Sequence, residues 1–210
     1  MILPAGFAGA AFGNAADGNG RDEAAARADI SAALGIPAAW AWLRQVHGAQ
    51  VMAARHAGDL GEGDAAFTTI PGLPIAVATA DCFPVVLEGP GGVGIAHAGW
   101  RGVVLGVVAT LRAAMSGAGI PVARAAIGPG IGPCCFEVGA DVAERFDDEW
   151  VTTTSRGTTS VDLPGSIRRQ VEGLEVWDAA ACTRCDPAYR SYRRDGTDER
   201  QVGVAWLPYA

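Results

Sequence analysis

The chain has 210 residues, which is long enough to bury a hydrophobic core without disulfides. Half of its residues are apolar and 19% are charged, a balance typical of a globular protein. The net charge is −7 and the sequence pI is about 4.9, which argues against nucleic acid or an anionic membrane as the main partner. No apolar run approaches the roughly 20 residues that a membrane helix needs.

The cysteines and the N-terminus indicate a cytoplasmic protein. Five cysteines are an odd number without the spacing of a small disulfide scaffold, which favours reduced thiols. The first residues are apolar but carry no basic side chain before Arg21, which argues against a secretory signal. No sequence pattern indicates an oligomeric state.

Helices and strands alternate along the chain. Alanine-rich residues 21–34 predict a surface helix that ends at Gly35 and Pro37, and the glycine-rich residues 59–64 predict a loop. Apolar residues spaced at i, i+3, i+4, i+7 and i+11 predict a helix over 103–116: Val104, Val107, Val108, Leu111 and Met115. Further helices are predicted at 138–146 and 163–174. Short apolar runs predict strands at 39–46, 49–54, 65–69, 74–80, 83–88, 92–96, 122–128, 174–179 and 201–207.

Strands outnumber helices and are interleaved with them, and neither a repeat nor a linker interrupts the pattern. We therefore expect one α+β or layered α/β domain over residues 1–210.

Three of the predicted strands end in a possible metal ligand. His47 follows the first, Asp81 and Cys82 follow the run PIAVATA, and His97 follows the run GVGIA. Catalytic groups are commonly placed on loops at the ends of rigid elements. Two imidazoles and a thiolate from distant segments match a catalytic zinc site, in which a fourth position stays open and bound water has a pKa of about 7. We interpret His47, Cys82 and His97 as a candidate metal site, with Asp81 as a hydrogen-bond partner or proton acceptor.

Other interpretations use the same residues. One alternative is that the cysteine and histidines are ordinary core and surface residues. Another is that Cys82 and His97 form a thiolate–imidazolium pair for acyl transfer. A blue-copper site would add a methionine such as Met52. A multicopper oxidase fits poorly because the chain has three histidines, of which His56 lies in a polar surface stretch.

Arg101 follows His97 in the segment HAGWRG, beside the start of the predicted helix. A guanidinium at a helix N-terminus suits an oxyanion or a phosphate group, although a surface or ion-paired arginine is an equally good interpretation. The neighbouring Trp100 is either a stacking platform for a flat ligand or a packing residue.

The remaining motifs are weaker. The loop GPGIGPCC at 128–135 lacks the Lys-Ser/Thr ending of a P-loop, so it predicts a tight turn beside the site. Cys134 and Cys135 are expected to be small buried residues. Cys182 and Cys185 form a C-x-x-C pair, but no second pair of that spacing completes a four-cysteine zinc site. The segment SYRRDG at 191–196 predicts a turn that is either a salt-bridged corner or a lid contact.

Six segments in order resemble one known family: RQVHG, ADCFPVVL, HAGWRG, AIGPGIGPCCFEVG, CT and SYRRDG. The chain resembles the YfiH-like family, long labelled multicopper polyphenol oxidases of laccase type and now described as zinc-dependent purine nucleoside phosphorylases. The resemblance implies a single-domain, four-layer α-β-β-α sandwich with mixed sheets. It also implies zinc ligands at His47, Cys82 and His97. From their positions in the sequence we add Asp81 and Arg101 as further catalytic candidates.

The resemblance further implies phosphorolysis of adenosine, inosine and methylthioadenosine, with adenosine deamination as a second reaction and phosphate as co-substrate. Two alternatives remain: a copper-dependent, laccase-like polyphenol oxidase, and an editing factor that acts on a peptidoglycan precursor. The chain departs from the family in residues 6–14, GFAGAAFGN, where members usually carry an arginine, and in the segment after SYRRDG.

Overall fold

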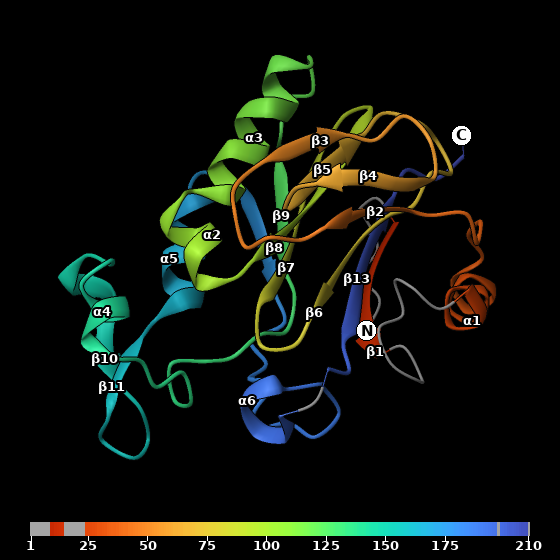
Figure 1. Cartoon of the computed structure of the whole chain (residues 1–210). Coiled ribbons are helices and arrows are strands. Elements are labelled where there is room, and N and C mark those ends of the chain that lie inside the picture. The colour runs from red at the N-terminus through yellow and green to blue at the C-terminus, as the bar shows by residue number, and fades with distance from the viewer. Residues whose placement is uncertain (1–8, 15–23, 197, 210) are drawn as a thin grey trace.

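Two mixed sheets pack face to face, with helices against both outer faces (Figure 1). The computed structural model describes residues 9–14, 24–196 and 198–209. The first sheet contains, in spatial order, β1 (Gly9–Asn14), β13 (Gln201–Trp206), β6 (Ile75–Thr79), β2 (Ala41–Arg44) and β4 (Gly58–Glu62). The second contains β12 (Glu175–Asp178), β9 (Arg124–Ile127), β7 (Phe83–Gly89), β8 (Gly92–Ala98), β5 (Ala65–Thr68) and β3 (Val51–Ala53).

Each sheet combines antiparallel and parallel pairs. In the first, β1, β13 and β6 are antiparallel neighbours, whereas β6, β2 and β4 run parallel. In the second, β9, β7, β8 and β5 are antiparallel neighbours, and β12 and β3 pair in parallel at the two edges. The strands that were predicted from apolar runs are all present, although several are shorter than predicted.

Three apolar layers hold this arrangement together. Phe12, Ile75 and Ile95 belong to the core between the two sheets. On the outer face of the first sheet, Trp40 and its neighbours contact Ile30 and Leu34 of α1 (Ala24–Leu34). On the outer face of the second sheet, a larger core includes residues of α2 (Trp100–Val104), α3 (Val107–Gly117) and α5 (Leu163–Gln170). The predicted α+β fold with four layers, α-β-β-α, is confirmed.

The other elements lie beside these layers (Figure 1). The one-turn helix α4 (Ala140–Ala143) and the hairpin of β10 (Val151–Thr153) and β11 (Thr159–Val161) sit together, with a 3₁₀ turn at Asp148–Trp150. Helix α6 (Tyr192–Asp195) occupies the segment that was predicted as a turn, where Ser191 accepts a hydrogen bond from the Arg194 amide as N-cap. The predicted helix over 138–146 is reduced to the single turn of α4.

The predicted continuous helix over 103–116 is wrong at its start. Helix α2 ends at Val104 and α3 begins at Val107, because Gly106 between them has a φ of 73° that a helix interior does not accommodate. The apolar stripe changes accordingly. Val103 is buried, whereas Val104 is 39% exposed.

The predicted loop over 59–64 is also wrong, since most of it is the edge strand β4. This strand pairs in parallel with β2 despite its glycines, with a register shift between Trp42 and Arg44 that the positive φ angles of Gly58 and Gly61 accompany. An ion pair of 2.6 Å joins Arg44 to Asp59 across the pair. For the predicted helix over 21–34, residues 21–23 lie outside the described residues.

Within the described ranges, no helix combines the length and the hydrophobicity needed to span a bilayer.

Leu111 of α3 is fully buried, whereas Leu105, between α2 and α3, is 61% exposed. The same Leu→Ala substitution at both positions therefore isolates the effect of burial on stability. We expect Leu111→Ala to lower the free energy of unfolding by about 2–5 kcal/mol, because it removes buried methyl groups and leaves a cavity. Leu105→Ala should change it by less than about 0.5 kcal/mol. Urea denaturation measures both values. Equal losses for the two variants would contradict the packing described for α3.

Candidate metal centre and the surrounding cavity

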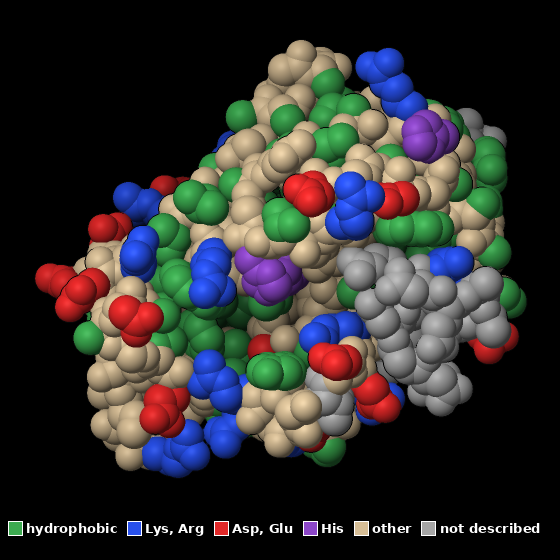
Figure 2. Space-filling view, in the orientation of Figure 1, with side chains coloured by type: hydrophobic (Ala, Val, Ile, Leu, Met, Phe, Trp, Pro, Cys, Tyr) green, Lys and Arg blue, Asp and Glu red, His purple; other side chains and the backbone are tan. Residues whose placement is uncertain are grey.

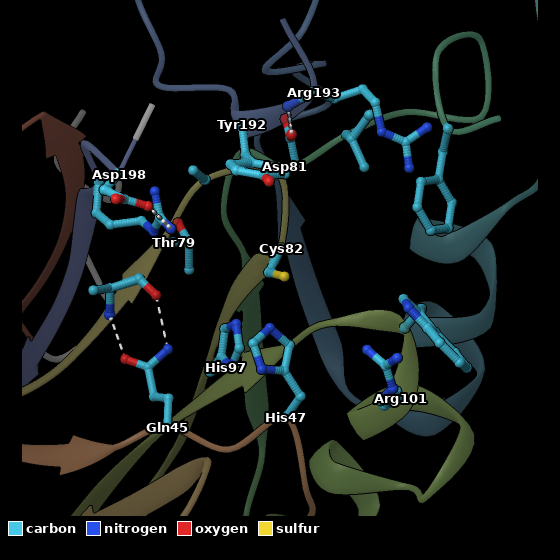
Figure 3. Close-up of a pocket in the computed structure, with 16 residues that line it drawn as sticks. Gln45, His47, Thr79, Asp81, Cys82, His97, Arg101, Tyr192, Arg193 and Asp198 are labelled. Carbon is cyan, nitrogen blue, oxygen red and sulfur yellow. Dashed lines mark hydrogen bonds and ion pairs between the residues drawn. The ribbon is translucent and has the colours of Figure 1, made fainter. Parts of the chain in front are cut away.

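The structure brings His47, Cys82 and His97 together, with ligand atoms that all lie within 4.8 Å of one another (Figure 3). The two imidazole rings meet edge to face, with ring centroids 4.8 Å apart. His47 lies beyond β2, and Cys82 lies in the turn between β6 and β7. His97 is inside β8 rather than just past its end, which corrects the predicted boundary of that strand.

The hairpin of β7 and β8 sets the spacing of two of these residues. Phe83 is opposite Ala98 in the antiparallel register, so the residues that flank this pair, Cys82 and Gly99, come side by side. A Cβ atom on Gly99 would lie 3.0 Å from the Cys82 sulfur and 3.1 Å from the His47 ring. A side chain at this position would therefore crowd the donor groups, which glycine avoids.

A buried carboxylate, Asp64, positions two of the three residues. Asp64 is completely buried, and its Oδ1 lies 2.8 Å from Nδ1 of His97. The same carboxylate accepts hydrogen bonds from three consecutive backbone N–H groups, those of Val46, His47 and Gly48, at 3.2, 2.9 and 2.7 Å. Consecutive N–H groups that converge in this way form an anion-binding nest. His47 has a φ of 61° in this turn.

The Asp64 contact selects which nitrogen of His97 can bind a metal. With Nδ1 donating to the carboxylate, Nε2 is the nitrogen that faces Cys82 and His47 and that would give up its proton to bind a metal, as in the carboxylate–histidine pairs of zinc sites. Sequence reasoning missed Asp64 because it stands in a glycine-rich acidic segment that reads as a loop. The available signal was its place directly before the apolar strand AAFT.

Electrostatics favour the deprotonated thiol. Burial raises the pKa of Cys82, but the charge of His97 and hydrogen bonds with both imidazoles outweigh burial and bring the pKa to about 6. Burial lowers the pKa of His97, but Cys82 and Asp64 outweigh it and raise that pKa to about 9. Burial alone would raise the pKa of Asp64, yet its hydrogen bonds to His97 and to the backbone lower it. Metal binding requires a cysteine in the thiolate form, which this environment supplies.

A cavity of about 640 Å³ opens above the three donors, a volume within the usual range of small-molecule sites. Figure 2 shows the hollow, with a histidine at its edge, an apolar floor and arginines around its rim. Trp100, Ile131 and Phe136 supply large apolar faces to the cavity. Tyr192 and Arg193 of α6 line it from the opposite side to His47 (Figure 3).

Asp81 lines the cavity, but its carboxylate is directed at the start of α6, toward Arg193 (Figure 3). Oδ1 accepts a hydrogen bond from the Thr183 hydroxyl and Oδ2 accepts one from the Arg193 amide, both at 2.7 Å. Asp81 has a φ of 80°, a left-handed conformation that is uncommon outside glycine. No hydrogen bond to Cys82 is among those of the described residues.

Arg101 also lines the cavity, with its guanidinium 4.4 Å from the centre of the Trp100 ring. In the described part of the chain no carboxylate lies within ion-pair distance of this exposed guanidinium, in contrast to Arg44 and Arg124. Thr79 is a cavity residue that sequence reasoning missed. Its buried hydroxyl has no hydrogen-bond partner among the described residues.

Met52, which was considered as a copper ligand, and His56, which was predicted to be a surface residue, do not line the cavity. Met52 lies on β3, and His56 is exposed, with its Nδ1 3.0 Å from the carbonyl oxygen of Ala57. The described residues therefore offer a single cluster of histidine and cysteine donors at this cavity.

A second group of possible metal ligands was not predicted. Cys134, Cys135, Cys182 and Cys185 meet with all four sulfurs within 4.8 Å of one another. The sequence contains no second C-x-x-C pair, and two adjacent cysteines on a tight turn supply the other two sulfurs instead. That turn belongs to the glycine- and proline-rich loop, which lies beside the cavity as predicted and contributes Ile131 and Phe136 to its wall.

Comparisons with known proteins agree with this architecture. The family model described as "Multi-copper polyphenol oxidoreductase laccase" matches residues 6–208. A Deinococcus radiodurans protein named purine nucleoside phosphorylase is 42% identical over 194 residues, covering 87% of this chain and 76% of that protein. A Streptomyces griseus protein, purine nucleoside phosphorylase ORF3, is 40% identical and covers 83% of this chain and 77% of its own length.

Solved structures show the same fold. The Bacillus licheniformis hypothetical protein YfiH superposes with a TM-score of 0.85 at 25% identity, covering 95% of this chain and 92% of that one. YlmD from Geobacillus stearothermophilus superposes with a TM-score of 0.83 at 27% identity, covering 96% of this chain and 92% of that one. The match of the family model over nearly the whole chain, together with these relatives, shows that this protein belongs to the multi-copper polyphenol oxidoreductase laccase family, which includes YfiH.

Proposed function

We propose that this protein is a zinc-dependent purine nucleoside phosphorylase, with zinc held by His47, Cys82 and His97. The observation that carries the proposal is the convergence of two imidazoles and one thiol within 4.8 Å, at a cavity of about 640 Å³. The names of the curated relatives support a nucleoside as the substrate class.

The donor set fits zinc. Zinc binds both imidazole and thiolate groups, and three protein ligands leave the fourth position to a ligand from the cavity. The Asp64 carboxylate fixes the orientation of His97 in the way that histidine ligands require. When bound, zinc would supply a Lewis acid at the cavity floor.

Phosphorolysis requires the chain to hold two substrates in contact. A phosphate oxygen forms a bond to C1′ of the ribose while the C1′–N9 bond breaks, and its electron pair leaves with the purine, which takes up a proton. The products are the free base and ribose 1-phosphate. Arg101 would orient the phosphate with paired N–H donors, because no carboxylate of the described residues competes for them. Trp100 and Phe136 would contact the flat purine.

We assign adenosine, inosine and methylthioadenosine as the substrates, with adenosine deamination as a second reaction at the same centre. The names of the curated relatives support this substrate class. Copper is the competing metal, since the description of the family names it and a cysteine with two histidines also suits copper. The position of Met52 away from the cavity removes the axial ligand that a blue-copper site would use.

Removal of the thiolate ligand tests the metal centre directly. Cys82→Ala should lose about one zinc ion per chain relative to the wild type, because two imidazoles alone hold zinc weakly. Phosphorolysis of adenosine and inosine should fall to background in the same preparation. Metal content is measured by mass spectrometry and turnover by release of free base.

The matched control for this experiment is His56→Ala, which removes an exposed imidazole outside the cavity and should retain both metal and turnover. Unchanged zinc content and turnover in Cys82→Ala would refute the proposal. Oxygen consumption with a phenol by copper-loaded wild type, without nucleoside turnover, would favour the oxidase instead.

Replacement of the buried carboxylate tests its role as a positioning residue. Asp64→Asn places an amide NH₂ where backbone N–H groups now donate, so it should weaken zinc binding about 10–100-fold. Competition with a chromophoric chelator measures the zinc affinity of the site that contains Cys82, which is the site that Cys82→Ala empties. The control is Asp59→Asn, the same replacement in an exposed carboxylate that pairs with Arg44. It should leave the zinc affinity unchanged. A variant at Asp64 that loses thermal stability but keeps its zinc affinity would show a structural role only.

Phosphate recognition is tested at Arg101. Arg101→Ala should raise the KM for phosphate about 10–100-fold, since charge-assisted hydrogen bonds contribute about 1.5–3 kcal/mol, while the KM for inosine changes little. Arg101→Lys keeps the charge but loses the paired N–H donors, so its KM for phosphate should lie between those of the wild type and Arg101→Ala. The exposed Arg55, which does not line the cavity, provides the control variant Arg55→Ala. Equal KM values for phosphate in Arg101→Ala and wild type would exclude this contact.

A further inference from the structure

Four of the five cysteines meet between the loop that contributes Ile131 to the cavity wall and the segment that leads to α6. Cys134 and Cys135 belong to the loop after β9, and Cys182 and Cys185 to the segment between β12 and α6. Their four sulfur atoms all lie within 4.8 Å of one another. The fifth cysteine, Cys82, belongs to the metal centre described above.

Tight backbone turns aim each pair of sulfurs at the other. In the first turn, the amides of Cys135 and Phe136 donate to the carbonyl oxygen of Gly132. In the second, the amides of Cys185 and Asp186 donate to the carbonyl oxygen of Cys182. The two turns are then joined by the main chain, because Gly130 and Cys182 form a parallel bridge and the Thr183 amide donates to the Gly130 carbonyl oxygen at 3.0 Å.

The sulfur–sulfur distances match a common centre better than a covalent pair. The Cys134 sulfur lies 3.7 Å from the Cys135 sulfur and 3.8 Å from the Cys185 sulfur. The Cys135 and Cys185 sulfurs are 3.3 Å apart. Four sulfurs bound to zinc at about 2.3 Å form a tetrahedron with edges of about 3.8 Å. A disulfide would need about 2.05 Å between one pair. Here the Cys185 sulfur contacts two others at once, as a vertex of a tetrahedron does.

The surroundings support thiolate ligands. The amide of Gly132 donates a hydrogen bond to the Cys182 sulfur at 3.3 Å, the kind of contact that stabilises a metal-bound thiolate. Gly132 also packs directly against the cluster, since a Cβ atom there would lie 3.4 Å from the Cys134 sulfur. Cys135 is buried, whereas Cys185 is exposed, so an ion has a route to the site.

We propose that Cys134, Cys135, Cys182 and Cys185 form a second metal site, a tetrathiolate site for one structural zinc ion. Tetrahedral sites with four sulfurs are the preferred environment of zinc, and such closed sites stabilise folds rather than catalyse reactions. The ion would join the loop that carries Ile131 and Phe136 to the segment that leads to Tyr192 and Arg193. It would thus hold two walls of the cavity at a fixed separation.

The two metal sites can be separated by variants. Zinc content after dialysis should be about two ions per chain in the wild type, about one in Cys82→Ala, about one in Cys185→Ser and none in the double variant. Cys185 is exposed, so serine at this position should be tolerated by the fold. Retention of the wild-type zinc content by Cys185→Ser overturns the proposal. Loss of one ion in Cys185→Ser but none in Cys82→Ala supports it and instead removes the metal centre of the proposed function.

Cobalt gives an independent readout that does not depend on the stability of Cys185→Ser. Addition of Co²⁺ to metal-free Cys82→Ala should produce the strong sulfur-to-metal charge-transfer bands and visible ligand-field bands of a tetrahedral cobalt with four thiolates. Addition of zinc should bleach these bands with one equivalent, and alkylation of the four thiols should be suppressed by zinc and restored by chelator. A spectrum with fewer thiolates, or a disulfide among these cysteines in the isolated wild type, refutes the site.

Discussion

The arrangement of the candidate metal centre depends on one buried carboxylate. Asp64 is inaccessible to solvent, and an isolated carboxylate in such a place would cost several kcal/mol. Three backbone amides and one imidazole offset that cost, and by doing so they fix the turn that carries His47 and the ring plane of His97. The positions of two donors therefore follow from the solvation of one charge.

The centre also depends on how the two sheets pack. His47 follows β2 of the first sheet, His97 lies on β8 of the second, and Cys82 lies in the turn that joins the first sheet to the second. The three donors thus lie at one end of the apolar layer between the sheets, which includes Ile75 and Ile95. The meeting of the three donors therefore depends on how the two sheets pack against each other.

The local sequence predicted nine of the strands and the three donors, because apolar runs and strand ends are read within a few residues, whereas the four layers were implied by the family resemblance. It did not predict Asp64 or the cysteine cluster, since both depend on contacts between distant segments. The acidic and glycine-rich residues 59–64 predict a solvated loop when read locally, and only the pairing of β4 with β2 makes most of them a strand. Cys134 and Cys182 are brought together by the bridge between Gly130 and Cys182, for which no local pattern exists. The break at Gly106 was visible in the sequence, but the regular apolar stripe concealed it.

The strained conformation of Asp81 has a mechanical consequence. Its two carboxylate oxygens hold Thr183 and the amide of Arg193, while its backbone continues directly into Cys82. A displacement of α6 must either break the contact with Arg193 or pull on Asp81, whose φ of 80° leaves little freedom to absorb the movement. The position of α6 and the position of Cys82 are therefore linked through a single residue.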